Sequence, residues 1–207
     1  MEYSNIGEKI KLLTGSGMWH TQEVEGLPSV HLSDGPHGLR KQEEKERQNN
    51  VSLVSTCYPT ASALACSWDV TAAERLGRAV AKEAWNADVA VLLGPGINMK
   101  RSPLCGRNFE YFSEDPFLAG RLGAAYVSAA QGEDVAVSLK HFAANNQETN
   151  RQTSNSQIDE RALREIYLSA FEYVVKTARP ATIMASYNRL NGYYACENRH
   201  LLTEILR

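Results

Sequence analysis

The chain has no long hydrophobic run and no excess of charge of one sign. It contains no stretch of about 18 consecutive apolar residues, which argues against a membrane-spanning helix. Its 22 lysine and arginine residues nearly balance 24 aspartate and glutamate residues, for a formal net charge of −2. A protein that binds nucleic acid concentrates basic residues on one face, so the composition argues against that partner as well.

Cysteines are few and scattered. The four cysteines form no C-x-x-C pair, and this argues against a zinc site. The segment from Met1 to Ile10 is polar and charged, unlike a secretory signal, so we expect reduced thiols and a cytoplasmic location. A dinucleotide-binding loop would need a third glycine after Gly94 and Gly96, but Met99 stands there. We therefore expect neither a metal nor a cofactor.

Short apolar runs recur along the chain. Three of them, at 89–93, 135–139 and 181–185, do not alternate polar with apolar residues, and a shorter run at 30–32 precedes them. Strands that are apolar on both faces belong to parallel sheets covered by helices. The pattern predicts an α/β fold, either a doubly wound sheet or a (β/α) barrel.

Helical patterns lie between these strands. Thr71 and Glu74 have the spacing of a capping box at the start of a helix. Other helices are expected over 6–13, 117–130, 159–179 (before Pro180) and 198–207, and the polar run 41–50 is expected to be a loop. Four strands cannot close a barrel, so we expect a truncated chain or one completed by a partner.

Polar side chains follow each predicted strand. The four segments are 33–40, a long loop over 94–116, 140–148 and 186–192. Because function lies at the carboxyl ends of parallel strands, we expect these segments to form one site. They contain many hydrogen-bond donors and a few acceptors, a mixture that suits a polyol whose hydroxyls must each be paired. A phosphate would meet Asp34 and Glu110, which oppose it.

Four segments resemble glycoside hydrolase family 3, above all its bacterial β-glucosidases. They are DGPHGLR at 34–40, GRNFE at 106–110, KHF at 140–142 and MASYN at 184–188, and the similarity extends along essentially the whole chain. The resemblance implies that residues 1–207 form an incomplete (β/α)8 barrel, roughly its first half to five-eighths. The rest of the barrel and a C-terminal domain would be absent from this chain.

The resemblance also implies a role for particular residues. A terminal glucosyl unit of a β-glucoside or short oligosaccharide would be bound by Asp34, Arg40, Arg107, Lys140, His141, Arg151, Met184 and Tyr187. Asp34 would accept hydrogen bonds from two sugar hydroxyls, and the basic side chains would donate to others. Tyr187 would lie close to the nucleophile, and Met184 would pack nearby.

The family retains configuration, which requires two carboxyl groups roughly 5 Å apart. Its nucleophile is an Asp in a Ser-Asp-Trp-like segment, which this chain lacks, and its acid/base is a Glu of the later domain. The resemblance therefore implies a substrate-binding portion that is inactive alone, with the nucleophile beyond Arg207. Ala143-Ala144-Asn145 replaces the Pro-Gly-His of the family's N-acetylglucosaminidases, which argues against that branch.

Several alternatives stay open. The chain could be a non-catalytic sugar-binding module, or one half of a split enzyme completed in trans. β-Xylosidases and arabinofuranosidases of the family share much of this motif set. Among single residues, we expect Glu110 to brace a neighbouring arginine and Glu114 to lie on the surface. We expect Trp68, Trp85 and Phe171 in the core, and Trp19 is a candidate for lining the pocket.

Overall fold

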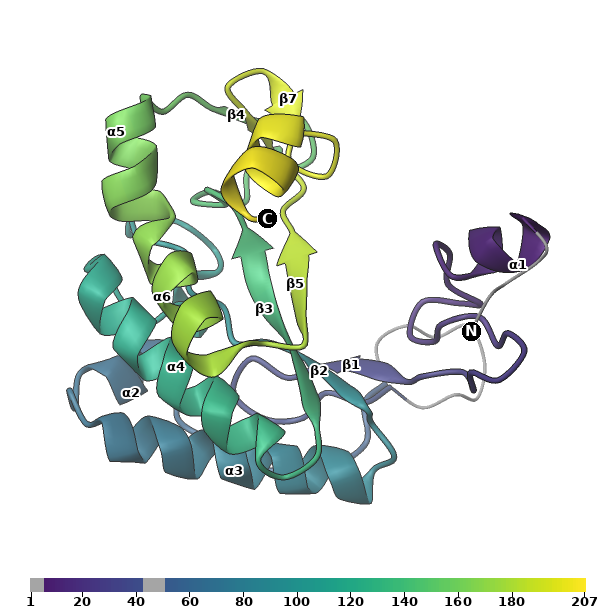
Figure 1. Ribbon diagram of the computed structural model, residues 1–207. Helices are drawn as coiled ribbons and strands as arrows, with labels where there is room; N and C mark the ends of the chain where they lie inside the picture. The colour runs from purple at the N-terminus through teal and green to yellow at the C-terminus, as the bar shows by residue number, and fades with distance from the viewer. Residues whose placement is uncertain (1–5, 43–50) are drawn as a thin grey trace.

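The computed structural model describes residues 6–42 and 51–207 (Figure 1). Most of the predicted loop at 41–50 lies outside the described residues. Helices and parallel strands alternate along the chain, which confirms the predicted α/β class. None of the helices in the described ranges combines the length and apolar character needed to cross a membrane.

Four parallel strands form the main sheet, in the order β1-β2-β3-β5. They are β1 (Leu32–Asp34), β2 (Val91–Leu93), β3 (Ala136–Phe142) and β5 (Thr182–Ala185). Leu32 lies opposite Val91, which in turn lies opposite Ala136, and β5 joins the other side of β3. Strands that are neighbours in the sheet thus follow one another in the chain, with helices between them, as in a (β/α) barrel.

Two strands end later in the chain than predicted. β1 includes Asp34, and β3 continues through Phe142, so Lys140 and His141 are strand residues rather than loop residues. The apolar run that marks β3 in the sequence ends at Leu139. Pairing with β5 nevertheless continues, with Lys140 opposite Met184. The strand is therefore longer than its apolar signal, because its last residues belong to a polar site.

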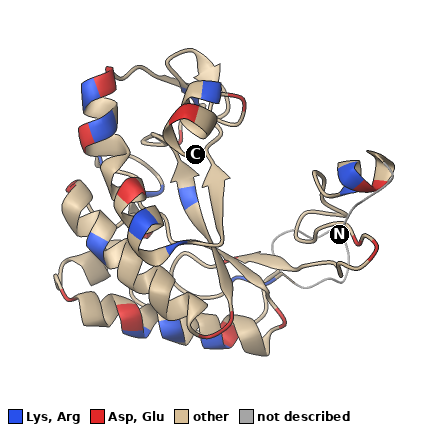
Figure 2. Cartoon of the chain, in the orientation of Figure 1, with Lys and Arg blue, Asp and Glu red and all other residues tan. Residues whose placement is uncertain are grey.

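Three helices lie side by side against the sheet (Figure 1): α3 (Val70–Asn86), α4 (Pro116–Gln131) and α6 (Ser169–Ala178). The buried residues of α4 are mostly alanine and glycine, which allows α3 and α6 to approach it closely. A Cβ atom on Gly77 of α3 would lie 2.5 Å from the carbonyl oxygen of Tyr126 in α4, so this crossing requires glycine. Figure 2 shows charged residues along the outer sides of these helices.

Helix α3 begins before the predicted capping box. Asp69 is its N-cap and accepts a hydrogen bond from the Thr71 amide at 2.8 Å. The Thr71 hydroxyl donates to the same Asp69 oxygen instead of capping the helix itself. The prediction of a capping box at Thr71 is therefore wrong. Asp and Thr are both favourable N-cap residues, and their order in the sequence does not choose between them.

The predicted helix at 159–179 is divided by a wider turn. Asp159 caps the short α5 (Glu160–Ala162), a π-helical turn η2 (Leu163–Tyr167) follows, and α6 completes the path. The Leu168 amide bonds the carbonyl of Leu163, five residues back, at 2.9 Å. Pro180 lies just beyond the end of α6, as predicted.

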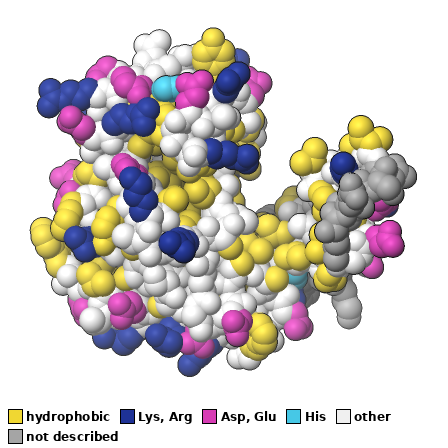
Figure 3. Space-filling model, in the orientation of Figure 1, with side chains coloured by type: hydrophobic (Ala, Val, Ile, Leu, Met, Phe, Trp, Pro, Cys, Tyr) yellow, Lys and Arg dark blue, Asp and Glu magenta, His cyan; other side chains and the backbone are white. Residues whose placement is uncertain are grey.

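The remaining elements are short. They are α1 (Ile6–Lys11), α2 (Ala61–Ala65), η1 (Asn108–Glu110), η3 (His200–Ile205) and a small sheet of β4 (Asn155–Ser156), β6 (Arg189–Leu190) and β7 (Tyr193–Tyr194). Helix α1 buries none of its residues. The segment that carries it stands off from the main body, with hydrophobic side chains on its surface (Figure 3). The predicted terminal helix corresponds to the π-helical η3.

The core lies between the sheet and its helices and includes Phe171, as predicted. Trp68 and Trp85 were predicted there too, but they are 74% and 60% exposed. Trp85 follows buried Ala84 in α3, and one residue along a helix turns the side chain by about 100° toward the outer face. Trp68 lies outside the helices, in the turn at 66–68 that follows α2. The predictions for Glu110 and Glu114 are confirmed, because Glu110 bonds Arg107 and Glu114 is exposed.

Candidate functional site

A cleft of about 600 Å³ lies at the carboxyl end of the sheet. All eight predicted site residues line it: Asp34, Arg40, Arg107, Lys140, His141, Arg151, Met184 and Tyr187. They come from β1, the loop after β1, the loop between β2 and α4, β3, the loop after β3, β5 and the turn after β5. The structure thus brings the predicted set together. Its sugar-binding role stays a prediction.

Lys140 is a buried charged group in the lining of the cleft. Its side chain is only 2% exposed, and its Nζ lies 3.4 Å from Glu110 Oε2 and 3.6 Å from Asp34 Oδ1. Glu110, 3% exposed, also accepts a hydrogen bond from Arg107 Nε. Buried charges persist only where they are paired, so Glu110 is the group that holds two cations in place.

Glu110 also affects the protonation of Arg107. Burial alone would lower the pKa of the Arg107 guanidinium, but the hydrogen bond and the charge of Glu110 outweigh burial and leave the pKa above its ordinary value. The cleft therefore contains a permanent cation with several N–H groups. The three-residue spacing between Arg107 and Glu110 in the sequence already indicated that the two side chains could form an ion pair.

His141 follows Lys140 in β3, is equally buried, and is neutral. Burial, with the nearby charges of Arg107, Lys140 and Arg151, lowers the pKa of His141 to about 2. Asn98 holds the backbone of His141 on both sides, because its Oδ1 accepts from the amide and its Nδ2 donates to the carbonyl, each at 2.8 Å. The ring therefore enters the cleft as an uncharged group with a fixed backbone.

Arg151 is held by two contacts at the rim. Its Nη1 donates to Glu148 Oε2 at 2.9 Å, and its guanidinium carbon lies 5.0 Å from the centre of the Tyr187 ring. The loop at 148–157 offered little reason in the sequence to place Arg151 in the site. The ion pair with Glu148 and the cation–π contact with Tyr187 supply that reason in three dimensions.

Asp34 and Arg40 are joined by a tight turn. The Arg40 amide donates to the Asp34 carbonyl at 2.7 Å, which returns the chain to the mouth of the cleft. Gly38 within this turn has φ +147°, and a Cβ there would lie 2.2 Å from the Thr56 carbonyl oxygen. A turn-forming role and a site role for Asp34 are thus compatible, because its side chain still faces Lys140.

Other lining residues were not predicted as binding residues. They are Met18, Pro36, Leu93, Phe109, Glu110 and Glu148, together with Trp19, whose place the sequence left open. Trp19 Nε1 donates to Gln42 Oε1 at 3.0 Å, so its ring is anchored at the edge of the cleft. Met18 and Phe109 carry no polar group that points to a site. Met18 and Phe109 lie in the cleft only because the chain segments that carry them fold back toward the carboxyl end of the sheet.

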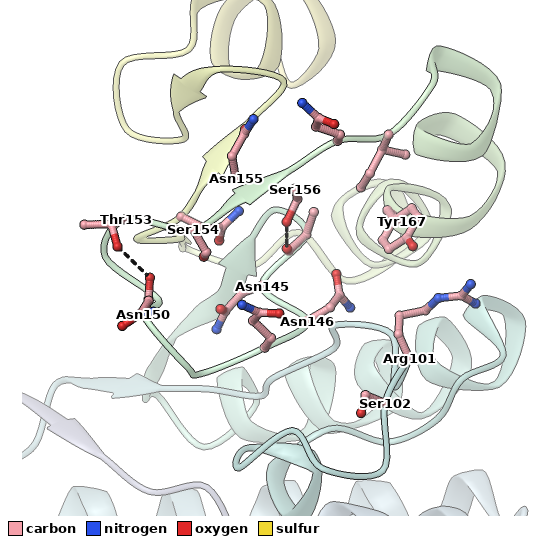
Figure 4. A pocket seen from close by; sticks show the side chains of 15 residues that line it. Arg101, Ser102, Asn145, Asn146, Asn150, Thr153, Ser154, Asn155, Ser156 and Tyr167 are labelled. Atoms are coloured by element: carbon pink, nitrogen blue, oxygen red, sulfur yellow. Dashed lines mark hydrogen bonds between the residues drawn. The ribbon is translucent and has the colours of Figure 1, made fainter.

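A second hollow, of about 580 Å³, lies beside the loop that follows β3 (Figure 4). Amide and hydroxyl side chains dominate its lining, including Asn145, Asn146, Ser154 and Asn155, and none of its lining residues is acidic. It shares no lining residue with the cleft. Asn145 nevertheless connects the two regions, because its amide bonds Glu148, which does line the cleft.

A parallel sheet covered by helices, with a polar cleft at its carboxyl end, defines a barrel-type enzyme domain. The glycosyl hydrolase family 3 N-terminal domain profile matches residues 36–207, and the chain belongs to this family. The chain is 54% identical to thermostable beta-glucosidase B of Acetivibrio thermocellus and 50% identical to an exo-alpha-(1->6)-L-arabinopyranosidase of Bifidobacterium longum. Each alignment covers 98% of the chain and 27% of the relative.

The fold is likewise that of solved family members. Beta-glucosidase 3B of Thermotoga neapolitana, in complex with alpha-D-glucose, matches with a TM-score of 0.91 at 40% identity, over 98% of the chain and 31% of that protein. The predicted barrel-type fold and the predicted family are therefore confirmed. The chain spans between a quarter and a third of the length of these relatives.

Proposed function

We propose that the cleft binds the terminal non-reducing sugar of a β-glucoside or short oligosaccharide, as the sugar-binding side of a retaining glycoside hydrolase. The observation that carries this proposal is the gathering of all eight residues around one cleft. The glucose complex of the Thermotoga relative supports it. The N-terminal barrel portion would then contribute recognition of the sugar, and the remainder of an enzyme would contribute bond cleavage.

The donors and acceptors of the cleft suit a neutral polyol. Arg107, Lys140 and Arg151 offer N–H groups that can only donate, while the Asp34 carboxylate can only accept. A sugar hydroxyl does both, so each can donate to Asp34 or accept from a cation. The Asp34 carboxylate can accept from a sugar hydroxyl but has no proton to donate to a phosphate oxygen, which favours the polyol.

Two of the three carboxylates of the cleft lining are engaged with cations. Glu110 is buried between two cations, and Glu148 is bonded to Arg151 and Asn145. Asp34 is the carboxylate left for sugar hydroxyls. We therefore propose that the nucleophile and the acid/base belong to a part of the enzyme outside these residues, which would complete the barrel in the same chain or in a second one.

The direct test is a titration of the 207-residue chain with glucose, followed by chemical-shift changes. We expect saturable binding that weakens roughly tenfold or more in Asp34→Asn, because hydrogen bonds to a charged group are worth about 1.5–3 kcal/mol. Asp88→Asn is the matched control, since Asp88 is exposed and is not among the residues that line the cleft. Equal affinity in the Asp34 variant and the wild type would overturn the proposed role of the cleft.

A hydrolysis assay tests the missing nucleophile separately. We expect no turnover of an aryl β-glucoside by the chain alone. Turnover that disappears in Asp34→Ala would contradict the assignment of catalysis to other residues. Binding without turnover is also expected of a non-catalytic sugar module. Recovery of activity with a second polypeptide that carries a Ser-Asp-Trp segment would favour a split enzyme over that module.

A second candidate is action on a pentoside. The relative from Bifidobacterium longum, named as an arabinopyranosidase, favours it at 50% identity. Pentopyranoses lack the hydroxymethyl group of glucose, so competition among glucose, L-arabinose and D-xylose in the same titration separates the candidates. Tighter binding of a pentose than of glucose would favour the pentoside.

A further inference from the structure

We propose that Tyr111 and Asn145, two buried side chains behind the cleft, fix His141 as the tautomer that presents an Nε2–H donor to the sugar. This inference rests on the proposed sugar-binding function of the cleft. Neither side chain is among the residues that line the cleft, and neither residue belongs to the four motifs. They would act as positioning residues, through the proton on the His141 ring.

The chain of contacts begins at Glu148. The Asn145 amide nitrogen Nδ2 lies 3.1 Å from Glu148 Oε1 and 3.1 Å from the Tyr111 hydroxyl oxygen. A carboxylate has no proton to donate, so it selects the NH₂ side of the amide. The reversed amide would place its carbonyl oxygen against that carboxylate. The two hydrogens of Nδ2 are thus divided between Glu148 and Tyr111.

The Tyr111 hydroxyl then has one proton left to donate. It accepts from Asn145, and the His141 ring nitrogen Nδ1 lies 3.0 Å from its oxygen. Tyr111 is completely buried, and burial is the main cause that raises its pKa, so the hydroxyl keeps its proton. The hydroxyl therefore donates to Nδ1, and Nδ1 must carry a lone pair.

A neutral imidazole has one N–H, and it must then be on Nε2. The ring is neutral because burial and three nearby cations lower the pKa of His141 to about 2. Nδ1 is occupied by Tyr111, so Nε2 is the ring nitrogen left for a ligand in the cleft. Glu148 would thus orient the Asn145 amide, which orients the Tyr111 hydroxyl, and this hydroxyl sets the position of the proton on His141. We call this series of contacts the relay.

The tautomer decides how a sugar hydroxyl can bond. With Nε2–H pointing into the cleft, a hydroxyl beside His141 accepts from the ring and keeps its own proton for an acceptor such as Asp34. With the opposite tautomer, Nε2 would be an acceptor, and the sugar hydroxyl would have to donate its proton to the ring instead of to Asp34. The relay therefore fixes the direction of hydrogen bonding across the sugar. It also makes Glu148 and Arg151 part of the same arrangement, through their ion pair.

The test is the nitrogen NMR spectrum of histidine in the 207-residue chain labelled with ¹⁵N-histidine. His141→Asn identifies the His141 signals among those of the five histidines. We expect Nδ1 to resonate as an unprotonated acceptor and Nε2 as a protonated nitrogen, without change between pH 5 and pH 7. A protonated Nδ1 in the wild-type chain would overturn the proposal.

Two variants examine the relay itself. Tyr111→Phe removes the donor to Nδ1, and we expect a mixture of His141 tautomers. An even mixture halves the population of the competent tautomer, so glucose binding should weaken by roughly twofold. Tyr126→Phe is the matched control, because Tyr126 is also buried but lies in the helical core away from the cleft. It should change neither the spectrum nor the affinity.

Glu148→Gln removes the group that orients the Asn145 amide, and a tautomer mixture is expected there too. This variant and the wild-type spectrum decide the matter if Tyr111→Phe does not fold. An unchanged spectrum in both Tyr111→Phe and Glu148→Gln would overturn the relay. A wild-type chain with the expected tautomer but no glucose binding would contradict the proposed function and leave the relay intact.

Discussion

Replacing Glu110 with glutamine should destabilise the protein by about 3 kcal/mol. Glu110 Oε2 lies 3.4 Å from Lys140 Nζ, and both side chains are at least 97% buried. At an effective dielectric constant of about 20, two unit charges at that distance attract by about 5 kcal/mol. The variant loses this attraction but keeps the side-chain volume, one acceptor for Arg107 and the Asp34 partner of Lys140. The low end of the roughly 3–5 kcal/mol range for breaking a buried pair is therefore expected.

Urea denaturation followed by circular dichroism measures this change, by linear extrapolation to water. Glu114→Gln is the matched control, because Glu114 is exposed, and it should stay within about 0.5 kcal/mol of the wild type. Glucose binding should weaken in Glu110→Gln alone, since Arg107 and Lys140 lose their common support. A Glu110→Gln chain within 1 kcal/mol of the wild type, with unchanged affinity, would refute the role given to the buried carboxylate.

Three further predictions concern pH and packing. The pKa of His141 is lowered to about 2 in the folded chain and is about 6.5 in the unfolded chain, so the contribution of the neutral ring to folding stability is complete above pH 6.5 and declines as the pH falls toward 2. Wild-type stability should therefore decrease more steeply from pH 7 to pH 5 than that of His141→Asn. Equal slopes would contradict the burial of a neutral ring. Gly77→Ala should lower stability by about 1–3 kcal/mol in the same urea assay, since its Cβ would lie 2.5 Å from the Tyr126 carbonyl oxygen, and a gain would show that the helices can separate. Phe171→Ala should lower the free energy of unfolding by about 3–5 kcal/mol, and Trp85→Ala should lower it by less than about 0.5 kcal/mol. A larger loss of thermal stability in the Trp85 variant than in the Phe171 variant would show that Trp85 belongs to the core.

Much of the site was predictable because the motifs lie at strand ends. Asp34, Lys140 and Met184 come from three different strands, and the carboxyl ends of neighbouring parallel strands meet at one edge. Identifying the strands was therefore enough to predict that these residues converge. The composition of the segments predicted a polar cleft, and the cleft has that character.

The supporting side chains were not predictable in the same way. Tyr111 lies 30 positions from His141, and Asn98 lies 43 positions from it. Each is a common residue in a long loop, with no spacing that identifies a partner. Their roles exist only because the loop after β2 returns to pack against β3. The exposure of Trp68 and Trp85 shows the converse, because a large aromatic residue favours the core only where the chain turns it inward.

The class of fold, the family and the eight cleft residues could be predicted from the sequence alone, because apolar periodicity and short motifs are properties of contiguous residues. The tertiary structure decided which charge is paired with which. It placed Glu110 between Arg107 and Lys140, and it set Tyr111 and Asn145 behind His141. Most of those pairings join segments far apart in the chain at distances of a few ångströms, and only the packing of the sheet, its loops and its helices creates them.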